Sequence, residues 1–272
     1  VLMDAFQRAA DYQTAWKAAE ENNKKKGAVP ITVRRDLELD ALVEIMNKKR
    51  FITCHSYVQS EINAAMKVGD KFGFTFNTFT HSYVQSEVNM LMHVADSMKF
   101  KVNTFTHILE GYKVADKMKA HGANASTFSD WWNYKMEVVD AIPYNAYIMH
   151  KVGLNVAINS DDAEMARRLN QEAAKSVKYG GMSEEEAWKM VTINPAKMLH
   201  VDSKVGSIKV GKDADLVVWS DNPLSIYARA EKTMVDGIIY FDRDKDAAMR
   251  IQNKNEKARL IQKLTIAKRT AT

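Results

Sequence analysis

Three histidines recur at a fixed spacing in the first half of the chain. His55, His81 and His107 are separated by two intervals of 26 residues, and the acidic pair Asp161-Asp162 follows a short apolar run further on. Neutral histidine is the commonest nitrogen ligand of zinc-like metals, and a carboxylate can complete such a site and accept a proton. If these side chains meet, they predict a hydrolytic metal centre in which the metal lowers the pKa of its bound water to roughly 7.

The even spacing comes from a tandem repeat. The string HSYVQSEINAAMKVGDKFGFTFNTFT, which starts at His55, is followed by HSYVQSEVNMLMHVADSMKFKVNTFT, which starts at His81, and 16 of the 26 positions are identical. Each copy has the pattern of one helix followed by one strand, and each strand leads to a histidine. Duplication copies a histidine whether or not that histidine has a function. The plain alternative, a strand-end histidine that only makes a hydrogen bond, therefore stays open for each of them.

The elements that must position these residues alternate between helix and strand. At intervals of 25–30 residues such elements indicate parallel strands joined by right-handed crossovers. The candidate residues all follow a strand, and in a (β/α) barrel that edge is the active-site face. The predicted fold class is α/β, with a partial TIM-type (β/α) barrel (its C-terminal half) over residues 1–200 and a tandem βα repeat at 55–106. The expected helices are 2–22, 36–48, 57–72, 83–98, 112–121, 142–151 and 164–179, and the expected strands are 50–54, 74–80, 100–106, 125–130 and 154–159.

The pattern changes after residue 200. Apolar runs separated by Gly, Asn-Pro and Asp-Gly turns predict strands at 205–208, at 215–219 and on both sides of the turn within 233–241. Residues 201–241 are thus expected to form a small β composite module, and residues 242–272 a charged helical tail. The chain starts at Val1 in an amphipathic pattern, which indicates the interior of a longer protein and leaves the localisation open.

Composition limits the class of protein. The 272 residues carry a net charge of +5, with 46% hydrophobic and 27% charged residues, which is ordinary for a globular chain of one large and one small domain. Basic residues in the tail alternate with acids and amides, so we expect a solvated helix and no nucleic-acid partner. No apolar run approaches the roughly 18–20 residues of a membrane span. The single cysteine, Cys54, excludes an internal disulfide.

Five segments resemble the amidohydrolase superfamily, and within it the imidazolonepropionase-like branch. They are THILEGYKVA, STFSDWWNYK, AINSDDAEMARRLNQEAAK, EEEAWKMVTINPAKML and VGSIKVGKDADLVVWSDNPL, and the resemblance extends to about Phe241. It implies a metal-dependent hydrolase that acts on non-peptide or cyclic amide C–N bonds of a small-molecule substrate. The cofactor implied is a divalent metal, with zinc as the first choice.

The resemblance also implies roles for single residues. In that family a histidine ends strand five, another ends strand six, and an aspartate ends strand eight. THILEG places His107 at strand six, and NSDD places Asp161 at strand eight, as metal ligand and general base together. The strand-five ligand is open: the context RFITCHSY matches His55, whereas the spacing to the strand-six histidine favours His81.

The aromatic residues near the end of strand seven are the candidate substrate-binding side chains: Trp131, Trp132 and Tyr134. A core role for the two tryptophans is the alternative. The chain also departs from the family, because it has no HxH pair and no strand-four lysine, and because the repeat adds one βα unit. A non-catalytic remnant is therefore the alternative function. Its exposed strand edges would favour pairing with another chain, so a homo-oligomer is among the expected partners.

Overall fold

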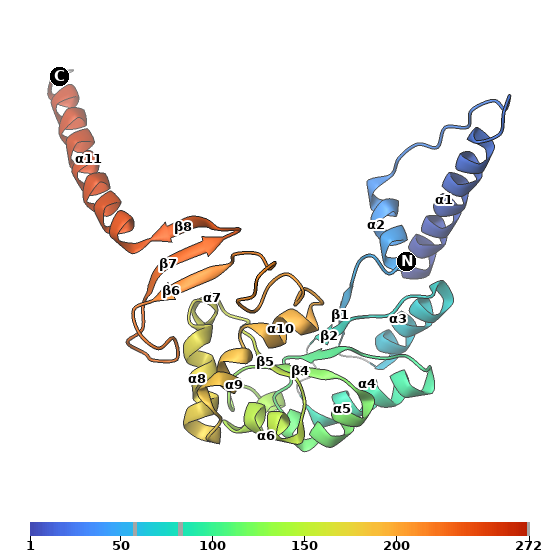
Figure 1. Ribbon diagram of the computed structural model, residues 1–272, viewed down its shortest axis with the longest axis horizontal. Helices are drawn as coiled ribbons and strands as arrows, with labels where there is room; N and C mark the ends of the chain where they lie inside the picture. The colour runs from blue at the N-terminus through green and yellow to red at the C-terminus, as the bar shows by residue number, and fades with distance from the viewer. Residues whose placement is uncertain (57–58, 81–83, 271–272) are drawn as a thin grey trace. The chain divides into compact units, whose positions relative to one another are not determined.

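The computed structural model describes residues 1–56, 59–80 and 84–270 (Figure 1). The chain divides into two compact units, Val1–Asn194 and Pro195–Thr272. The candidate residues of the sequence analysis all belong to the first unit, and each unit is described by itself.

A parallel sheet of five described strands forms the centre of the first unit. The strands lie side by side in the order in which they occur in the chain, each paired in parallel with the next. The α/β class with helices between parallel strands is as predicted. Because β1 and β5 lie at the two edges of this sheet, closure into a barrel stays a prediction. The strands are β1 (Thr53–His55), β2 (Thr78–Thr80), β3 (Thr104–Thr106), β4 (Asn124–Thr127) and β5 (Val156–Ile158).

Local signals explain where many of the helices begin and end. The Asp36 carboxylate accepts the backbone N–H groups of the first turn of α2, and the Ser183 hydroxyl accepts one at the start of α9. Gly122, Gly153 and Gly181 end helices in the left-handed conformation that glycine adopts at least cost. The helices of this unit are α1 (Leu2–Asn23), α2 (Leu37–Met46), α3 (Gln59–Phe72), α4 (Gln85–Ser97), η1 (Gly111–Lys113), α5 (Ala115–His121), η2 (Met136–Val138), α6 (Asn145–Val152), α7 (Ala163–Ala166), α8 (Leu169–Gly180) and α9 (Glu184–Lys189).

Two of the expected helices are divided in the structure. The helix expected at 164–179 occurs as α7 and α8, because the N–H of Arg168 closes a tight turn on the carbonyl of Met165. The helix expected at 112–121 occurs as η1 and α5, because the N–H of Val114 closes a similar turn on the carbonyl of Gly111. Periodicity alone does not distinguish such a break from a continuous helix.

The strand register gives the sheet one apolar face and one face rich in hydroxyl groups. Phe79 pairs with Phe105, and both side chains are completely buried. Ala125 and Val156 continue the same row across β4 and β5. Because side chains alternate along a strand, the neighbouring rows point to the opposite face, and on β2–β4 they carry mainly threonine and serine. Figure 1 shows helices α4, α5 and α6 along one side of the sheet.

The first helix packs against α3, the helix that follows β1, and against α2. The Phe6 ring stacks on Phe74, with the ring centroids 4.5 Å apart, and lies 5.7 Å from Phe72. Between α1 and α2 the Tyr12 hydroxyl donates to the Asp40 carboxylate at 2.9 Å. These contacts join the α1–α2 pair to the first copy of the repeat.

The second unit contains a three-stranded antiparallel sheet and a long helix. The strand pairing confirms the strand expected at 215–219 and the two strands joined by the Asp236-Gly237 turn. The strand expected at 205–208 is wrong: this segment is a turn, in which the Lys212 ammonium donates to the Val205 carbonyl at 3.1 Å. The elements are α10 (Ile193–Met198), which begins at the end of the first unit, β6 (Leu216–Trp219), β7 (Ala230–Val235), β8 (Ile238–Asp242) and α11 (Arg243–Thr270).

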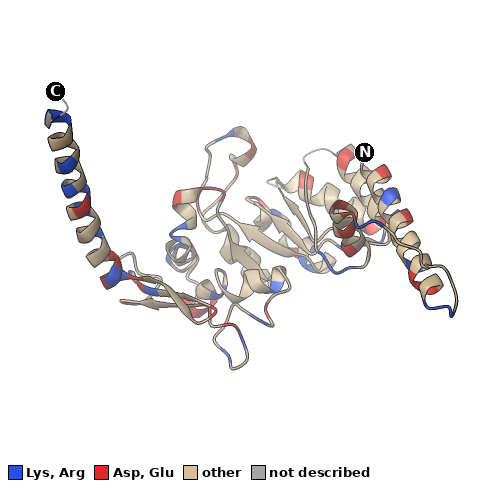
Figure 2. Cartoon of the chain, turned by 90° about the horizontal axis from the view of Figure 1, so that it is seen from above, with Lys and Arg blue, Asp and Glu red and all other residues tan. Residues whose placement is uncertain are grey.

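Within the tail expected at 242–272, residues Arg243–Thr270 form the helix α11. Its side chains from residue 247 to 269 are exposed, and Figure 2 shows Lys and Arg along it with fewer acids between them. Among the described residues, no helix combines the length and the apolar character that crossing a membrane requires.

Candidate active site

The carboxyl ends of three neighbouring strands carry the candidate chemistry. β3 leads into His107, β4 leads into a segment that begins with Phe128 and Ser129, and β5 leads into Asn159 and Asp161. Because the strands are parallel and adjacent, these segments follow the same edge of the sheet.

His107 is held in an unusual position. Its side chain is buried, with 8% of the residue exposed, and its ring lies against Phe128 with the ring centroids 4.7 Å apart. Its φ of 66° is in the left-handed region, which a residue other than glycine seldom adopts. The next residue, Ile108, donates its N–H to the Ser126 carbonyl at 3.2 Å, so the backbone stays tied to β4 beyond the end of β3.

Asn145, the first residue of α6, fixes this backbone from the side. Its amide nitrogen donates to the Ile108 carbonyl at 2.8 Å and to the Thr127 hydroxyl at 3.0 Å. Its amide oxygen accepts the N–H of Tyr112 at 2.9 Å. Only 2% of Asn145 is exposed, so these bonds form away from water. One buried amide thus connects the turn after His107 to the neighbouring strand.

The two aspartates after β5 have different roles. The Asp162 carboxylate accepts the N–H groups of Glu164 at 2.9 Å and Met165 at 3.0 Å, and therefore caps α7. Asp161 is exposed and takes no part in that cap. The Asn159 amide oxygen is buried without a hydrogen-bond partner in the described part of the chain. The segment therefore offers a solvent-accessible carboxylate and a buried acceptor two residues apart.

The donor set has the chemistry of a zinc site, since histidine nitrogen and aspartate oxygen are both common zinc ligands. Within residues 1–56, 59–80 and 84–270, however, no three His, Cys, Asp or Glu side chains form a group that could hold a metal ion. His55 is exposed at the end of β1, and His81 lies outside the described residues. The complete ligand set therefore stays a prediction.

The three aromatic candidates continue from the His107 ring. The Trp131 ring lies 5.8 Å from the Phe128 ring and edge-on to Tyr134 at 4.8 Å, measured between centroids. Both tryptophans pack partly buried against an apolar cluster that includes Phe128, whereas Tyr134 is 49% exposed. Trp132 meets the ring of Tyr179 edge-on. The tryptophans thus contribute to packing, and Tyr134 is the most accessible of the three.

Ionic contacts hold the segment after β4 against α8. The Glu172 carboxylate, 3% exposed, accepts from the Ser129 hydroxyl and from the Lys175 ammonium, the latter at 2.7 Å. Lys175 also contacts the Asp130 carboxylate. Trp131 adds a bond from its indole N–H to the Met165 sulfur at 2.8 Å. The aromatic segment is therefore fixed to the helices that follow Asp161.

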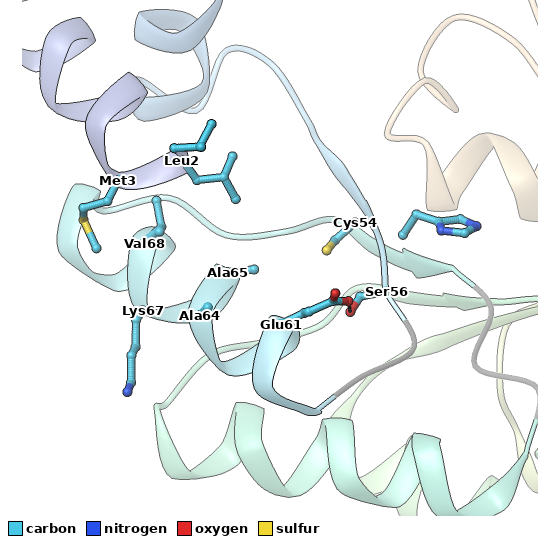
Figure 3. A pocket seen from close by; sticks show the side chains of 11 residues that line it. Leu2, Met3, Cys54, Ser56, Glu61, Ala64, Ala65, Lys67 and Val68 are labelled. Carbon is cyan, nitrogen blue, oxygen red and sulfur yellow. Dashed lines mark hydrogen bonds between the residues drawn. The ribbon is translucent and has the colours of Figure 1, made fainter.

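A pocket of about 690 Å³ lies where α1, β1 and α3 meet, and Cys54, Ser56 and Glu61 are among its lining residues (Figure 3). The Ser56 hydroxyl donates to the Glu61 carboxylate at 3.0 Å. Burial, and to a lesser degree the nearby Glu61 carboxylate, raise the pKa of the Cys54 thiol above its ordinary value of 9.0. This thiol is therefore protonated near neutral pH and is a poor nucleophile.

Sequence reasoning did not find Asn145 or Glu172. Asn145 contacts residues 18 to 37 positions away, and Glu172 reaches Ser129 across 43 positions. An asparagine at a helix start and a glutamate within an amphipathic helix are both ordinary in a sequence. Only the fold shows that the two side chains are buried.

Comparison with known proteins gives the same assignment for most of the chain. Residues 89–241 match the model of the Amidohydrolase family. The chain is 34% identical to amidohydrolase tasK of Hapsidospora irregularis over 116 residues, which are 42% of this chain and 12% of that protein. It is 34% identical to an imidazolonepropionase of Thermoplasma volcanium over 101 residues, 34% of this chain and 25% of that protein.

Solved structures show the same fold at lower identity. An amidohydrolase from Thermotoga maritima aligns with a TM-score of 0.62 and 22% identity, over 89% of this chain and 55% of that one. An adenosine deaminase from Xanthomonas campestris with bound zinc aligns with a TM-score of 0.55 and 15% identity, over 88% of this chain and 64% of that one. The chain thus spans a quarter or less of these two curated relatives and less than two thirds of these two structures.

Proposed function

Because the chain belongs to the amidohydrolase family, we propose that it forms the part of a metal-dependent hydrolase that carries the strand-six and strand-eight ligands, His107 and Asp161. The proposed substrates are small molecules with non-peptide or cyclic amide C–N bonds. The observation that carries the proposal is the placement of a buried histidine and an exposed aspartate at the carboxyl edge of one parallel sheet. The relative named imidazolonepropionase and the zinc-containing deaminase structure support this class of enzyme and metal.

In this proposal His107 and Asp161 hold a divalent metal together with one strand-five histidine, either His55 or His81. Zinc, when bound, supplies an activated water by lowering its pKa to roughly 7. The Asp161 carboxylate accepts a proton from the attacking water and delivers it to the leaving nitrogen. Asn145 keeps the backbone next to His107 in place, since it bonds to the Ile108 carbonyl.

The substrate is proposed to lie against the aromatic segment after β4, with Trp131, Trp132 and Tyr134 as its binding side chains. The exposed Tyr134 ring offers a flat apolar surface and a hydroxyl group to a cyclic amide. The contact of Trp131 with Met165, four residues after Asp161, keeps this segment close to the proposed general base.

A second candidate function is a non-catalytic remnant of such an enzyme. One observation favours it: in the ranges that the structure describes, no group of three donor side chains is complete. The two candidates differ in whether the protein hydrolyses any amide once it is supplied with zinc.

The test is hydrolysis of a panel of cyclic ureas, imides and N-acyl amines by the zinc-loaded protein and by two aspartate variants. Asp161→Asn should lower kcat/KM by about 10²–10⁴-fold, the usual contribution of a general base. Asp162→Asn is the matched control, because asparagine caps a helix about as well as aspartate. Equal losses in both variants would contradict the role of Asp161, and no hydrolysis of any substrate by the parent would favour the remnant.

A further inference from the structure

The tandem repeat folds as two successive βα units, α3 with β2 and α4 with β3. The register that joins the two strands pairs Thr78 with Thr104 and Thr80 with Thr106, and both pairs are 26 residues apart. This offset equals the length of the repeat, so equivalent residues of the two copies lie side by side. A shift from β2 to the neighbouring β3 therefore superposes each strand residue of the first copy on its equivalent in the second copy.

The second copy makes specific contacts with the element that follows it, α5. The Asp96 carboxylate lies 2.7 Å from His121 Nδ1, and the N–H of Val102 donates to His121 Nε2 at 3.1 Å. Since Nε2 accepts a backbone N–H, Nδ1 carries the proton and donates it to Asp96. On the preceding turn of α5 the Lys117 ammonium donates to the Asn89 side chain at 3.2 Å.

The first copy contains the same side chains at the equivalent positions. Asp70 corresponds to Asp96, and Asn63 corresponds to Asn89. A further contact is made by the Asn124 amide, which donates to the Asn103 carbonyl at 2.8 Å, and Asn103 corresponds to an asparagine at position 77. The first copy can therefore present the same partners to α5 and β4.

We infer that residues 81–106 are a removable unit: without them, α3 and β2 take the places of α4 and β3 beside α5 and β4. The β3–β4 register pairs Thr104 with Asn124, so the shortened chain would pair Thr78 with Asn124. The Asp70 carboxylate then faces His121. Thr78 and Asp70 have the same residue types as Thr104 and Asp96, whereas the backbone N–H that Val102 donates to His121 would come from Phe76.

The two copies differ in their contacts with the start of the chain. Phe6 packs on Phe72 and Phe74 of the first copy. The equivalent residues of the second copy are Met98 and Phe100, so one aromatic partner would be lost if the first copy were removed. Removal of the second copy leaves these contacts intact. These contacts predict which of the two similar units is dispensable.

Removal of residues 81–106 also distinguishes between His55 and His81, the two candidates for the strand-five metal ligand. This part of the inference rests on the proposed function. In the shortened sheet β1, which ends at His55, pairs with β2, and β2 leads directly into His107. His55 then lies at the end of β1 and His107 directly after the neighbouring β2, whereas His81 has been removed. The proposed ligand set of the shortened protein is His55, His107 and Asp161.

The first experiment compares two deletions of equal length, residues 81–106 and residues 55–80, by thermal unfolding. Both leave one complete copy of the repeat in phase. The first variant should unfold cooperatively and at the higher Tm, because Phe6 keeps both aromatic neighbours. Absence of a cooperative transition in this variant, or an equal or higher Tm in the other one, would overturn the inference.

The second experiment follows the hydrogen bond between His121 and an aspartate from one copy to the other. In the full chain Asp96→Asn should lower the Tm by about 2 °C, the shift expected for somewhat less than 1 kcal/mol in a chain of this size, and Asp70→Asn should leave it unchanged. In the chain without residues 81–106, Asp70→Asn should cause the shift, and His121→Ala should abolish its effect. An unchanged Tm for Asp70→Asn in the shortened chain would overturn the inference.

The third experiment measures zinc binding to the shortened chain by calorimetry. His55→Ala should weaken zinc binding at least tenfold, whereas the control His150→Ala, at the end of α6, should not. Unchanged zinc binding in His55→Ala would overturn the assignment of His55. If the first two experiments give the expected results and the shortened chain binds no zinc, the inference that residues 81–106 are removable is supported and the proposed metal site is contradicted.

Discussion

Asn145 is the side chain on which the geometry beside His107 most depends. Replacement by alanine removes the acceptor of the Tyr112 N–H and the donors to the Ile108 carbonyl and the Thr127 hydroxyl. The Thr127 hydroxyl retains a second bond, in which it donates to the Phe128 carbonyl at 3.3 Å. Two backbone groups therefore lose the partner that Asn145 provides.

The loss of stability in Asn145→Ala follows from the number of backbone groups that lose a hydrogen-bond partner. A buried donor or acceptor that loses its partner costs about 1–3 kcal/mol, so the two backbone groups together predict a loss of about 2–6 kcal/mol in the free energy of unfolding. A domain of ordinary stability has only about 5–15 kcal/mol in total. Asn145→Ala should therefore remove a large fraction of the stability of the first unit.

Denaturation in guanidinium chloride, followed by far-UV circular dichroism, measures this loss. Asn89→Ala is the matched control: its side chain accepts one exposed bond from Lys117, so its loss should stay within about 0.5 kcal/mol. The reasoning is refuted if Asn145→Ala and Asn89→Ala differ by less than about 1 kcal/mol.

Three further predictions concern charged groups. The rate at which iodoacetamide alkylates Cys54 should rise with a midpoint above pH 9.0, and Glu61→Gln should lower that midpoint while burial keeps it raised; a midpoint below 9.0 would contradict this. Glu172→Ala should cost about 1–3 kcal/mol in chemical denaturation because the Ser129 hydroxyl and the Lys175 ammonium lose a buried acceptor, although Lys175 keeps its contact with Asp130, whereas the exposed Glu164→Ala should cost under about 0.5 kcal/mol. Hydrogen bonds from Arg35 and then Tyr12 lower the pKa of Asp40 below 3.8, so its stabilisation is present above that pH and is lost as the pH falls through the lowered pKa. Asp40→Asn should therefore make the Tm less dependent on pH in this acid range, and an unchanged dependence would count against the contact.

The sequence predicted the parts of the fold that depend on local pattern. Alternating helix and strand indicated parallel pairing, and the strand order confirms it. The strand expected at 205–208 was wrong because Val205 and Ile208 match the strand pattern, whereas the Val205 carbonyl accepts from the Lys212 ammonium. Contacts of this kind depend on a lysine several residues away, which periodicity does not register.

The candidate site was predictable only in part. His107 and Asp161 follow strands, and that placement could be anticipated from the sequence. The left-handed backbone of His107, the amide of Asn145 and the buried carboxylate of Glu172 could not, because each depends on segments brought together by the fold. The different roles of Asp161 and Asp162 likewise follow only from the structure, in which Asp162 caps α7 and Asp161 does not.

The zinc content of the purified protein tests the central claim most directly. The account predicts about one zinc per chain after exposure to the metal and removal of excess, and loss of that zinc in the double variant His107→Ala/Asp161→Asn. The variant with Asp162→Asn alone should retain it. An unchanged zinc content in the double variant would contradict the proposed site.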